Sequence, residues 1–272
     1  MKKIKVIILR TAGTNCDKET AFAFESAGAI TELVHVNKLS SGTKSLDDYQ
    51  ILAIPGGFTY GDDIASGKIL ANELKFAIEK DLERFVNAGK LIIGICNGFQ
   101  VLVKAGLLPN LTGNFRTIEA TLTLNDSNKF EDRWVYLKRS RKDENRGRDK
   151  CVWTKGINGV ITLPVAHGEG KFIPKDKGVL SRLKNDGLIA LEYCSEDGKK
   201  ADYPYNPNGA VDGIAGICDP TGRIFGLMPH PERHLSLYQH PEWTRQEPAK
   251  QGKEGDGITI FKNGVNFAKK YL

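Results

Sequence analysis

One cysteine lies on a segment suited to a nucleophile. The segment LIIGICNGFQ, residues 91–100, is typical of a buried strand, a glycine-flanked turn at Cys96 and the start of a helix. Gly94-Ile95-Cys96-Asn97-Gly98 has the spacing of the GxSxG nucleophile elbow, with cysteine in place of serine. Such a turn lifts the Cys96 side chain to the carboxyl edge of a sheet, where the helix N-terminus favours thiolate over thiol. A buried structural cysteine is the alternative interpretation.

Cys16 is the rival cysteine, because it also falls between a predicted strand and a predicted helix. It ends a longer loop, 11–15, without glycines at the elbow spacing, so Cys96 is the favoured nucleophile. The five cysteines of the chain have no regular spacing and form no CxxC pair. We therefore predict no disulfide framework and no metal site, and a reducing cytoplasm is the simplest compartment.

A cysteine nucleophile needs a histidine that moves protons and a carboxylate that orients the histidine. Pro229-His230-Pro231-Glu232 offers both, because prolines keep the segment extended and residues two apart then project to the same side. His167, in His167-Gly168-Glu169-Gly170, is the alternative, but its glycine leaves the geometry less fixed. The other histidines lack this arrangement and are predicted to be surface or packing residues: His35, His234 and His240.

Backbone N–H groups without a covering side chain can form an oxyanion hole. The turn Pro55-Gly56-Gly57 follows a predicted strand and reaches the same sheet edge as Cys96. The N–H of Asn97, directly after the nucleophile, would be the second donor. A Pro-Gly-Gly turn is more often a plain loop, so the prediction depends on its combination with Cys96 and the His230–Glu232 pair.

Composition and charge exclude several classes of protein. The 272 residues are 40% hydrophobic and 26% charged, as in a folded soluble protein. Although the net charge is +6, the charged run 138–150 is interrupted by acidic residues and has no aromatics, so a solvated loop is favoured over a nucleic-acid contact. The apolar run Val6–Leu9 is too short for a signal peptide or a membrane span. The segment 61–68, GDDIASGK, resembles a phosphate loop, but its glycine spacing is one residue too long and Ile69 replaces the magnesium-binding Ser or Thr.

Short apolar runs alternate with helical patterns over the first hundred residues, which predicts a parallel sheet covered by helices on both faces. Asn15 is a possible cap of the first helix, and Gly28 ends it. Four strands are expected: 4–9, 31–36, 49–54 and 91–95. Three helices are expected: 17–27, 70–88 and 97–104.

The later part of the chain is richer in strands. A turn sequence at 219–222 joins the last two expected strands into a hairpin, and a final helix is expected near 263–271. Strands are expected at 118–124, 134–137, 152–154, 160–165, 188–193, 214–218 and 224–228. Since the proposed triad needs both halves, we predict one domain over 1–272, with 138–150 and 239–257 as surface loops.

Taken together, these motifs resemble the class I glutamine amidotransferases. The stretches GTNCD, GICNGFQ and VAHGEG, with asparagine after the cysteine, are closer to the glutaminase subunits of phosphoribosylformylglycinamidine synthase. The segments that carry the resemblance are 10–17 (RTAGTNCD), 55–62 (PGGFTYGD), 94–100 (GICNGFQ), 164–170 (PVAHGEG), 213–217 (GIAGI) and 226–233 (GLMPHPER). The resemblance implies a flavodoxin-like open, mostly parallel sheet with helices on both faces and extra antiparallel strands.

The resemblance also implies roles for site residues. Cys96 would be the nucleophile toward L-glutamine, His230 the general acid and base, and Glu232 its orienting carboxylate. The glycine turn at Gly56 and Gly57, together with Asn97, would bind the oxyanion. Gln100 would line the glutamine pocket.

A partner is implied as well. Such subunits pass ammonia to an ATP-dependent synthetase that amidates formylglycinamide ribonucleotide, sometimes with a small third subunit. ATP and Mg²⁺ would therefore be used by the partner, and no cofactor is expected in this chain. Lys129 departs from the family pattern, since arginine is expected there. The alternatives are a class I glutaminase serving another synthetase and a non-catalytic assembly subunit with the same fold.

Overall fold

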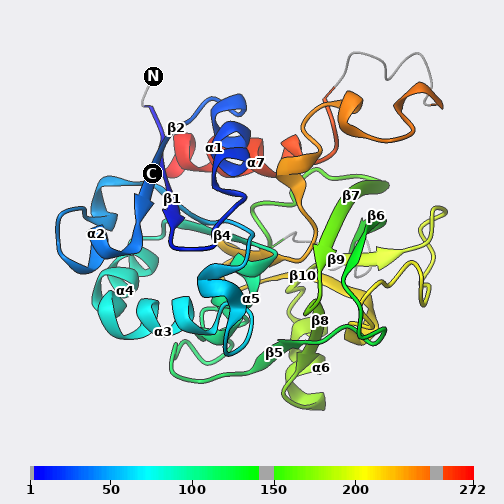
Figure 1. Cartoon of the computed structure of the whole chain (residues 1–272), viewed down its shortest axis with the longest axis horizontal. Coiled ribbons are helices and arrows are strands. Elements are labelled where there is room, and N and C mark those ends of the chain that lie inside the picture. Colours follow the sequence, from blue (N-terminus) through cyan, green and yellow to red (C-terminus); the bar gives the residue numbers. More distant parts are fainter. Residues whose placement is uncertain (1–2, 141–149, 246–253) are drawn as a thin grey trace.

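The computed structural model describes residues 3–140, 150–245 and 254–272 (Figure 1). Within these ranges the strands are β1 (Lys5–Arg10), β2 (Ile30–His35), β3 (Ile51–Ile54), β4 (Leu91–Ile95), β5 (Ala120–Thr123), β6 (Glu131–Arg139), β7 (Val160–His167), β8 (Lys171–Pro174), β9 (Ile189–Cys194), β10 (Ile214–Cys218) and β11 (Ile224–Leu227). The α-helices are α1 (Asp17–Ser26), α2 (Val36–Ser40), α3 (Lys68–Ala77), α4 (Glu79–Asn87), α5 (Asn97–Lys104), α6 (Lys177–Asn185) and α7 (Ile258–Tyr271).

A nine-stranded sheet forms the centre of the molecule, in the order β2-β1-β3-β4-β11-β10-β9-β6-β7. The strands from β2 to β11 pair in parallel, and those from β11 to β7 pair antiparallel. In the parallel part, β3 and β4 are buried along their whole length, which explains their continuous apolar sequences. The predicted fold class is confirmed: a parallel open sheet carries an antiparallel extension.

Helices cover both faces of the parallel part, as predicted. Helix α1 packs against β1, β2 and α7, whereas α5 packs against β3, β4 and β11, with α3 beside it. Figure 1 shows α1 and α7 together, apart from the group formed by α3, α4 and α5. Consecutive parallel strands leave their carboxyl ends at one edge, so the loops after β3, β4 and β11 meet there.

Several sequence predictions need correction. The helix expected at 70–88 is two helices, α3 and α4, because the backbone leaves helical geometry at Ile78 (φ −133°). The expected strand 152–154 forms turns, since the Trp153 indole is buried and donates to the carbonyl of Arg223 at 2.9 Å. Asn15 does not cap α1; Cys16 holds the cap position without a side-chain hydrogen bond. Among the described strands and α-helices, those that were not predicted are α2, α6 and β8.

Other predictions are confirmed with shifted limits. The hairpin of β10 and β11 forms, and Gly28 after α1 has a left-handed φ of 85°. Helix α7 begins at Ile258, before the expected residue 263. The predicted loop 138–150 lies mostly outside the described residues, although its first residues belong to β6; the middle of 239–257 also lies outside them. Among the described residues, no helix is long and apolar enough to cross a membrane.

Candidate active site

Cys96 sits on a strained turn between β4 and α5. Its φ of 51° and ψ of −106° lie outside the usual regions for a side-chain-bearing residue. Helix α5 approaches the neighbouring strand β3 so closely that a Cβ added to Gly98 would lie 1.9 Å from the Ile54 carbonyl oxygen. A Cβ on Gly94 would meet the Gly98 carbonyl oxygen at 2.5 Å. The predicted elbow is therefore present, and its glycines are required by close packing.

His230 and Glu232 form a buried pair directly after β11. The distance from His230 Nδ1 to Glu232 Oε1 is 2.7 Å, and each residue is only 2% exposed. The backbone N–H of His230 donates to the Pro164 carbonyl at 2.8 Å, which fixes the segment against β7. The other ring nitrogen, Nε2, has no hydrogen-bond partner in the described residues. The pairing of a histidine with a carboxylate two residues on is confirmed.

The charge balance around His230 favours the imidazolium. Burial alone would lower the pKa of His230, but the negative charge of Glu232 and interactions with the thiols of Cys96 and Cys16 raise it well above its ordinary value. A positively charged imidazole next to Cys96 is the arrangement that stabilises a thiolate.

His167, the alternative histidine, lies close to the site but plays a different part. Burial, with a smaller contribution from His230, lowers its pKa to about 3, so the ring is neutral at ordinary pH. Its Nε2 is 3.5 Å from the side-chain nitrogen of Asn208, and its Nδ1 has no partner in the described residues. Neighbouring Ala166 offers its carbonyl oxygen to Cys96 Sγ at 3.7 Å. The VAHGEG segment therefore forms a wall beside the nucleophile and does not supply the paired histidine.

The turn after β3 reaches the same edge. A Cβ on Gly56 would lie 2.8 Å from His230 Cε1 and 3.4 Å from Cys96 Cβ, so this glycine touches both residues. Gly57 has a φ of 139° and forms an isolated β-bridge with Thr14. As a glycine it has no side chain that could cover its own backbone N–H. Asn97 opens α5, where backbone N–H groups have no partner within the helix. The structure thus brings the two predicted donors to one edge.

The side chains of Asn97 and Gln100 face a polar network. Asn97 accepts from Thr59 Oγ1 at 2.7 Å and donates to Asp62 at 3.1 Å and to Gln100 Oε1 at 3.0 Å. Gln100 Nε2 donates to the Glu169 carbonyl at 2.6 Å. Both ends of the Gln100 amide are therefore engaged by the protein, and its predicted contact with glutamine stays a prediction.

Comparisons with known proteins agree with this geometry. A family model described as a CobB/CobQ-like glutamine amidotransferase domain matches residues 3–268. The phosphoribosylformylglycinamidine synthase subunit PurQ of Dehalococcoides mccartyi is 48% identical, covering 99% of this chain and 100% of the relative. PurQ of Methanococcus maripaludis is 46% identical, covering 98% of each chain. This chain belongs to the PurQ family of glutamine amidotransferases.

Solved structures support the assignment to the PurQ family. The structure of PurLQS from Thermotoga maritima matches with a TM-score of 0.69 and 30% identity, covering 98% of this chain and 99% of that chain. A putative GMP synthase subunit from Thermoplasma acidophilum matches with a TM-score of 0.57 at 15% identity, covering 100% of this chain and 96% of that chain. At this identity the match shows only that the two chains share a fold.

Sequence reasoning missed how close Cys16 lies to the active site of this PurQ-family chain. Cys16 is 1% exposed, and a Cβ on Gly56 would lie 3.3 Å from its sulfur. Arg233 Nη2 donates to Cys16 Sγ at 3.2 Å, and one donor atom of Cys16 lies within 4.8 Å of donor atoms of His230 and Glu232. The GTNCD motif was the available signal, but contact with residues more than 200 positions away cannot be derived from it.

Lys129, which stands where the family pattern has arginine, lies in a loop near the site but lines another cavity. Asn125 donates to the carbonyls of Lys129 at 2.9 Å and His167 at 2.8 Å, so this loop is tied to the wall beside Cys96. Lys129 itself lines a separate cavity of about 690 Å³, together with Lys200 and Tyr203.

Proposed function

We propose that this chain hydrolyses L-glutamine through a covalent intermediate on Cys96. The observation that carries the proposal is the buried His230–Glu232 pair, 2.7 Å apart, at the same sheet edge as the strained Cys96 elbow. The thiolate attacks the side-chain amide carbon, and the imidazolium of His230 gives its proton to the departing ammonia. Water then attacks the γ-glutamyl thioester, and His230 takes the proton from water so that Cys96 leaves as thiolate and glutamate is released.

The tetrahedral intermediate carries negative charge on the former amide oxygen. In this proposal the backbone N–H groups of Gly57 and Asn97 donate hydrogen bonds to this oxygen. Their position at the edge occupied by Cys96 supports the role. Gly56 must lack a side chain because a Cβ there would press on His230 and Cys96. The contribution of each such donor in other enzymes is about 2.7–4 kcal/mol of the activation barrier.

The family implies a synthetase partner. We infer that ammonia passes to the PurL synthetase of phosphoribosylformylglycinamidine synthase, which amidates formylglycinamide ribonucleotide, and that a small third subunit takes part as in PurLQS. We infer that ATP and Mg²⁺ are used by the partner. In support, the Gly67 N–H of the GDDIASGK segment donates to Asp62 at 3.1 Å and is therefore not free for a phosphate. A cytoplasmic location follows from this role in purine biosynthesis.

Labelling with a diazo-ketone analogue of glutamine tests the mechanism. We expect one adduct per chain on Cys96, located by peptide mass spectrometry, and no glutaminase activity in Cys96→Ala with the synthetase present. Cys16→Ser is the matched control, because its thiol lies beside the same histidine yet is not assigned the attack. An adduct on Cys16, or activity that survives Cys96→Ala, would contradict the assignment. Intact labelling without amidine formation by the complex would favour another synthetase or an assembly role.

A further inference from the structure

The side chain of Asn97 joins the two elements that supply the oxyanion donors. Its Oδ1 accepts from the Thr59 hydroxyl at 2.7 Å, and its Nδ2 donates to the Asp62 carboxylate at 3.1 Å. Thr59 lies two residues after Gly57 in the turn that follows β3, and Asn97 is the first residue of α5. One amide therefore ties the turn that carries one proposed donor to the helix that carries the other.

Every hydrogen-bonding group of this amide has a partner inside the protein. Asn97 is 1% exposed and Thr59 is 2% exposed, and Nδ2 of Asn97 also donates to Gln100 Oε1 at 3.0 Å. An ionised carboxylate can only accept hydrogen bonds, so Asp62 requires the amide nitrogen on its side and leaves the amide oxygen to Thr59. The Asn97 side chain thus has one orientation, and loss of Thr59 or Asp62 as a partner would leave part of a buried amide unpaired.

The backbone that carries Asp62 is held in an unfavourable conformation. Tyr60, Gly61 and Asp62 have consecutive φ values of 56°, 70° and 54°, in the left-handed region that residues with a Cβ rarely adopt. The Asp62 carboxylate also accepts from Ser66 Oγ at 3.0 Å and from the Gly67 N–H at 3.1 Å. A strained turn persists only where surrounding contacts hold it, and here those contacts converge on one carboxylate.

The same loop packs directly on α5. A Cβ on Gly67 would lie 3.3 Å from the Asn97 carbonyl oxygen, and Lys104 Nζ donates to the Ser66 carbonyl at 2.5 Å. These contacts set where the loop lies along the helix. The side chain of Asn97 adds a polar tie at the residue directly after Cys96, which is the point where the helix meets the proposed chemistry.

We propose that Thr59 and Asp62 are positioning residues that set the oxyanion hole through the Asn97 side chain. The inference rests on the proposed hydrolysis, in which the N–H groups of Gly57 and Asn97 bind the oxyanion. Two donors stabilise the tetrahedral intermediate fully only when both point at its oxygen, and a shift of about 1 Å can cost about 100-fold in rate. The carbonyl oxygen of bound glutamine carries less charge than the oxyanion, so the loss should appear in kcat more than in KM.

Paired substitutions of Thr59 test the inference in the complex with the synthetase. Thr59→Val keeps the shape of the side chain but removes the hydroxyl that donates to Asn97, so kcat of the glutaminase should fall about 10–100-fold while KM for glutamine stays within about 2-fold. Thr59→Ser retains the hydroxyl and should keep most of the wild-type kcat. Wild-type kcat in Thr59→Val, or equal impairment in Thr59→Ser, would overturn the inference. A raised KM with unchanged kcat would overturn it in favour of a role in substrate binding.

Alkylation of Cys96 separates the oxyanion hole from the nucleophile. Iodoacetamide reacts with a thiolate without forming an oxyanion, so the Cys96 alkylation rate of the full chain should be the same in Thr59→Val and in the wild type. Peptide mass spectrometry follows the reaction at Cys96. An equal drop in alkylation and in kcat would overturn the inference, because the network would then act on the thiolate.

Two neighbouring carboxylates provide a matched control. Asp62→Ala removes an acceptor of the Asn97 amide and should lower kcat at least as much as Thr59→Val, whereas Asp63 is exposed and Asp63→Ala should leave kcat and KM unchanged. Equal kcat in these two alanine variants would overturn the role of Asp62. Thermal unfolding accompanies each assay, and the Thr59 pair decides the outcome if Asp62→Ala does not fold. Glutaminase activity that survives Cys96→Ala would overturn the proposed function itself, which no result with Thr59 does.

Discussion

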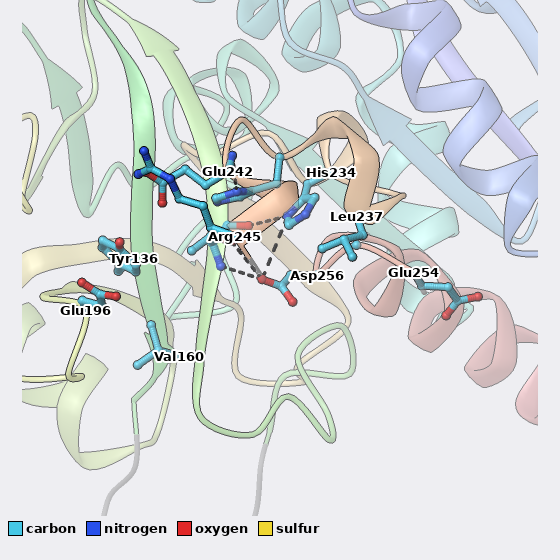
Figure 2. Close-up of a pocket in the computed structure, with 12 residues that line it drawn as sticks. Tyr136, Val160, Glu196, His234, Leu237, Glu242, Arg245, Glu254 and Asp256 are labelled. Atoms are coloured by element: carbon cyan, nitrogen blue, oxygen red, sulfur yellow. Dashed lines mark hydrogen bonds and ion pairs between the residues drawn. The ribbon is translucent and has the colours of Figure 1, made fainter. Parts of the chain in front are cut away.

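Two histidine-bearing regions lie next to each other along the chain and have different chemistry. In the first, His230 pairs with Glu232 at 2.7 Å beside Cys96. In the second, His234 and His240 line a cavity of about 600 Å³ (Figure 2). His234 Nδ1 lies 2.7 Å from the Thr162 carbonyl oxygen, an atom that can only accept, so Nδ1 carries the proton.

The carboxylate in the second region is committed elsewhere. Asp256 Oδ2 accepts from the backbone N–H of Thr162 at 2.8 Å and from its hydroxyl at 3.1 Å, and lies 4.0 Å from His234 Nδ1. Figure 2 shows Asp256 pointing toward His234 across this short gap. His234 instead packs its ring edge-on against Trp134, with centroids 4.9 Å apart. Of these two histidines, His230 alone combines a direct carboxylate bond on Nδ1 with a neighbouring thiol, which is the arrangement expected of a catalytic histidine.

The largest predicted effect sharpens this contrast directly. His230→Asn should lower glutaminase activity of the complex by about 10³–10⁴-fold, because no group remains to move the proton. His234→Asn, four residues away, should keep activity within a few-fold and lose about 1–3 kcal/mol of unfolding free energy, because the bond to Thr162 is disturbed. Activity assays and denaturant unfolding of both variants measure the difference. Equal loss of activity in the two would show that the second region also serves catalysis.

A second, smaller effect concerns the two carboxylates. Glu232→Gln should reduce kcat by about 10²–10⁴-fold, whereas Asp256→Asn should leave kcat nearly unchanged. Because the charge of Glu232 raises the pKa of His230 against the effect of burial, its removal lowers that pKa. The imidazolium that protonates ammonia is then lost at lower pH, so the alkaline limb of the kcat profile should move to lower pH. A profile in Glu232→Gln that keeps its wild-type alkaline limb would contradict the pairing.

Local features of the site could be predicted from the sequence. The Cys96 elbow depends on glycines within two residues, and the His230–Glu232 pair depends on an extended segment held by prolines, so both are encoded nearby. The neighbourhood of Cys16 and His230 depends on the order of β1, β3 and β11 in the sheet, which no local pattern contains.

The errors in the fold have a related cause. The apolar periodicity of 70–88 continues across Ile78, but α3 packs against α5 while α4 packs against the short 3-10 helix Leu46–Asp48, so the chain must change direction between them. The segment 152–154 (VWT) consists of β-branched and aromatic residues, as in a strand. The Trp153 indole instead packs on Gly264 of α7, where an added Cβ would lie 2.4 Å from the ring. In both places tertiary contacts override the local pattern.

The smallest predicted effect concerns His167, which shares one feature with each region. Like His230 it is buried near the active site, and like His234 it has no direct hydrogen bond to a carboxylate among the described residues. Its pKa of about 3 in the folded protein lies below the ordinary value of 6.5, so the unfolded chain binds more protons between these values. Stability contributed by the neutral ring is therefore present above the unfolded pKa and is lost as pH falls toward the folded one, by at most about 1.4 kcal/mol per pH unit.

His167→Gln can still accept from Asn208 and does not titrate in this range, so its unfolding free energy should vary less steeply with pH below about 6.5 than that of the wild type. Urea unfolding at a series of pH values measures both slopes, and the interval above about pH 7, where the unfolded histidine is mostly neutral, serves as the internal control. Parallel slopes for the two proteins in the acidic interval would show that His167 is already protonated in the folded state.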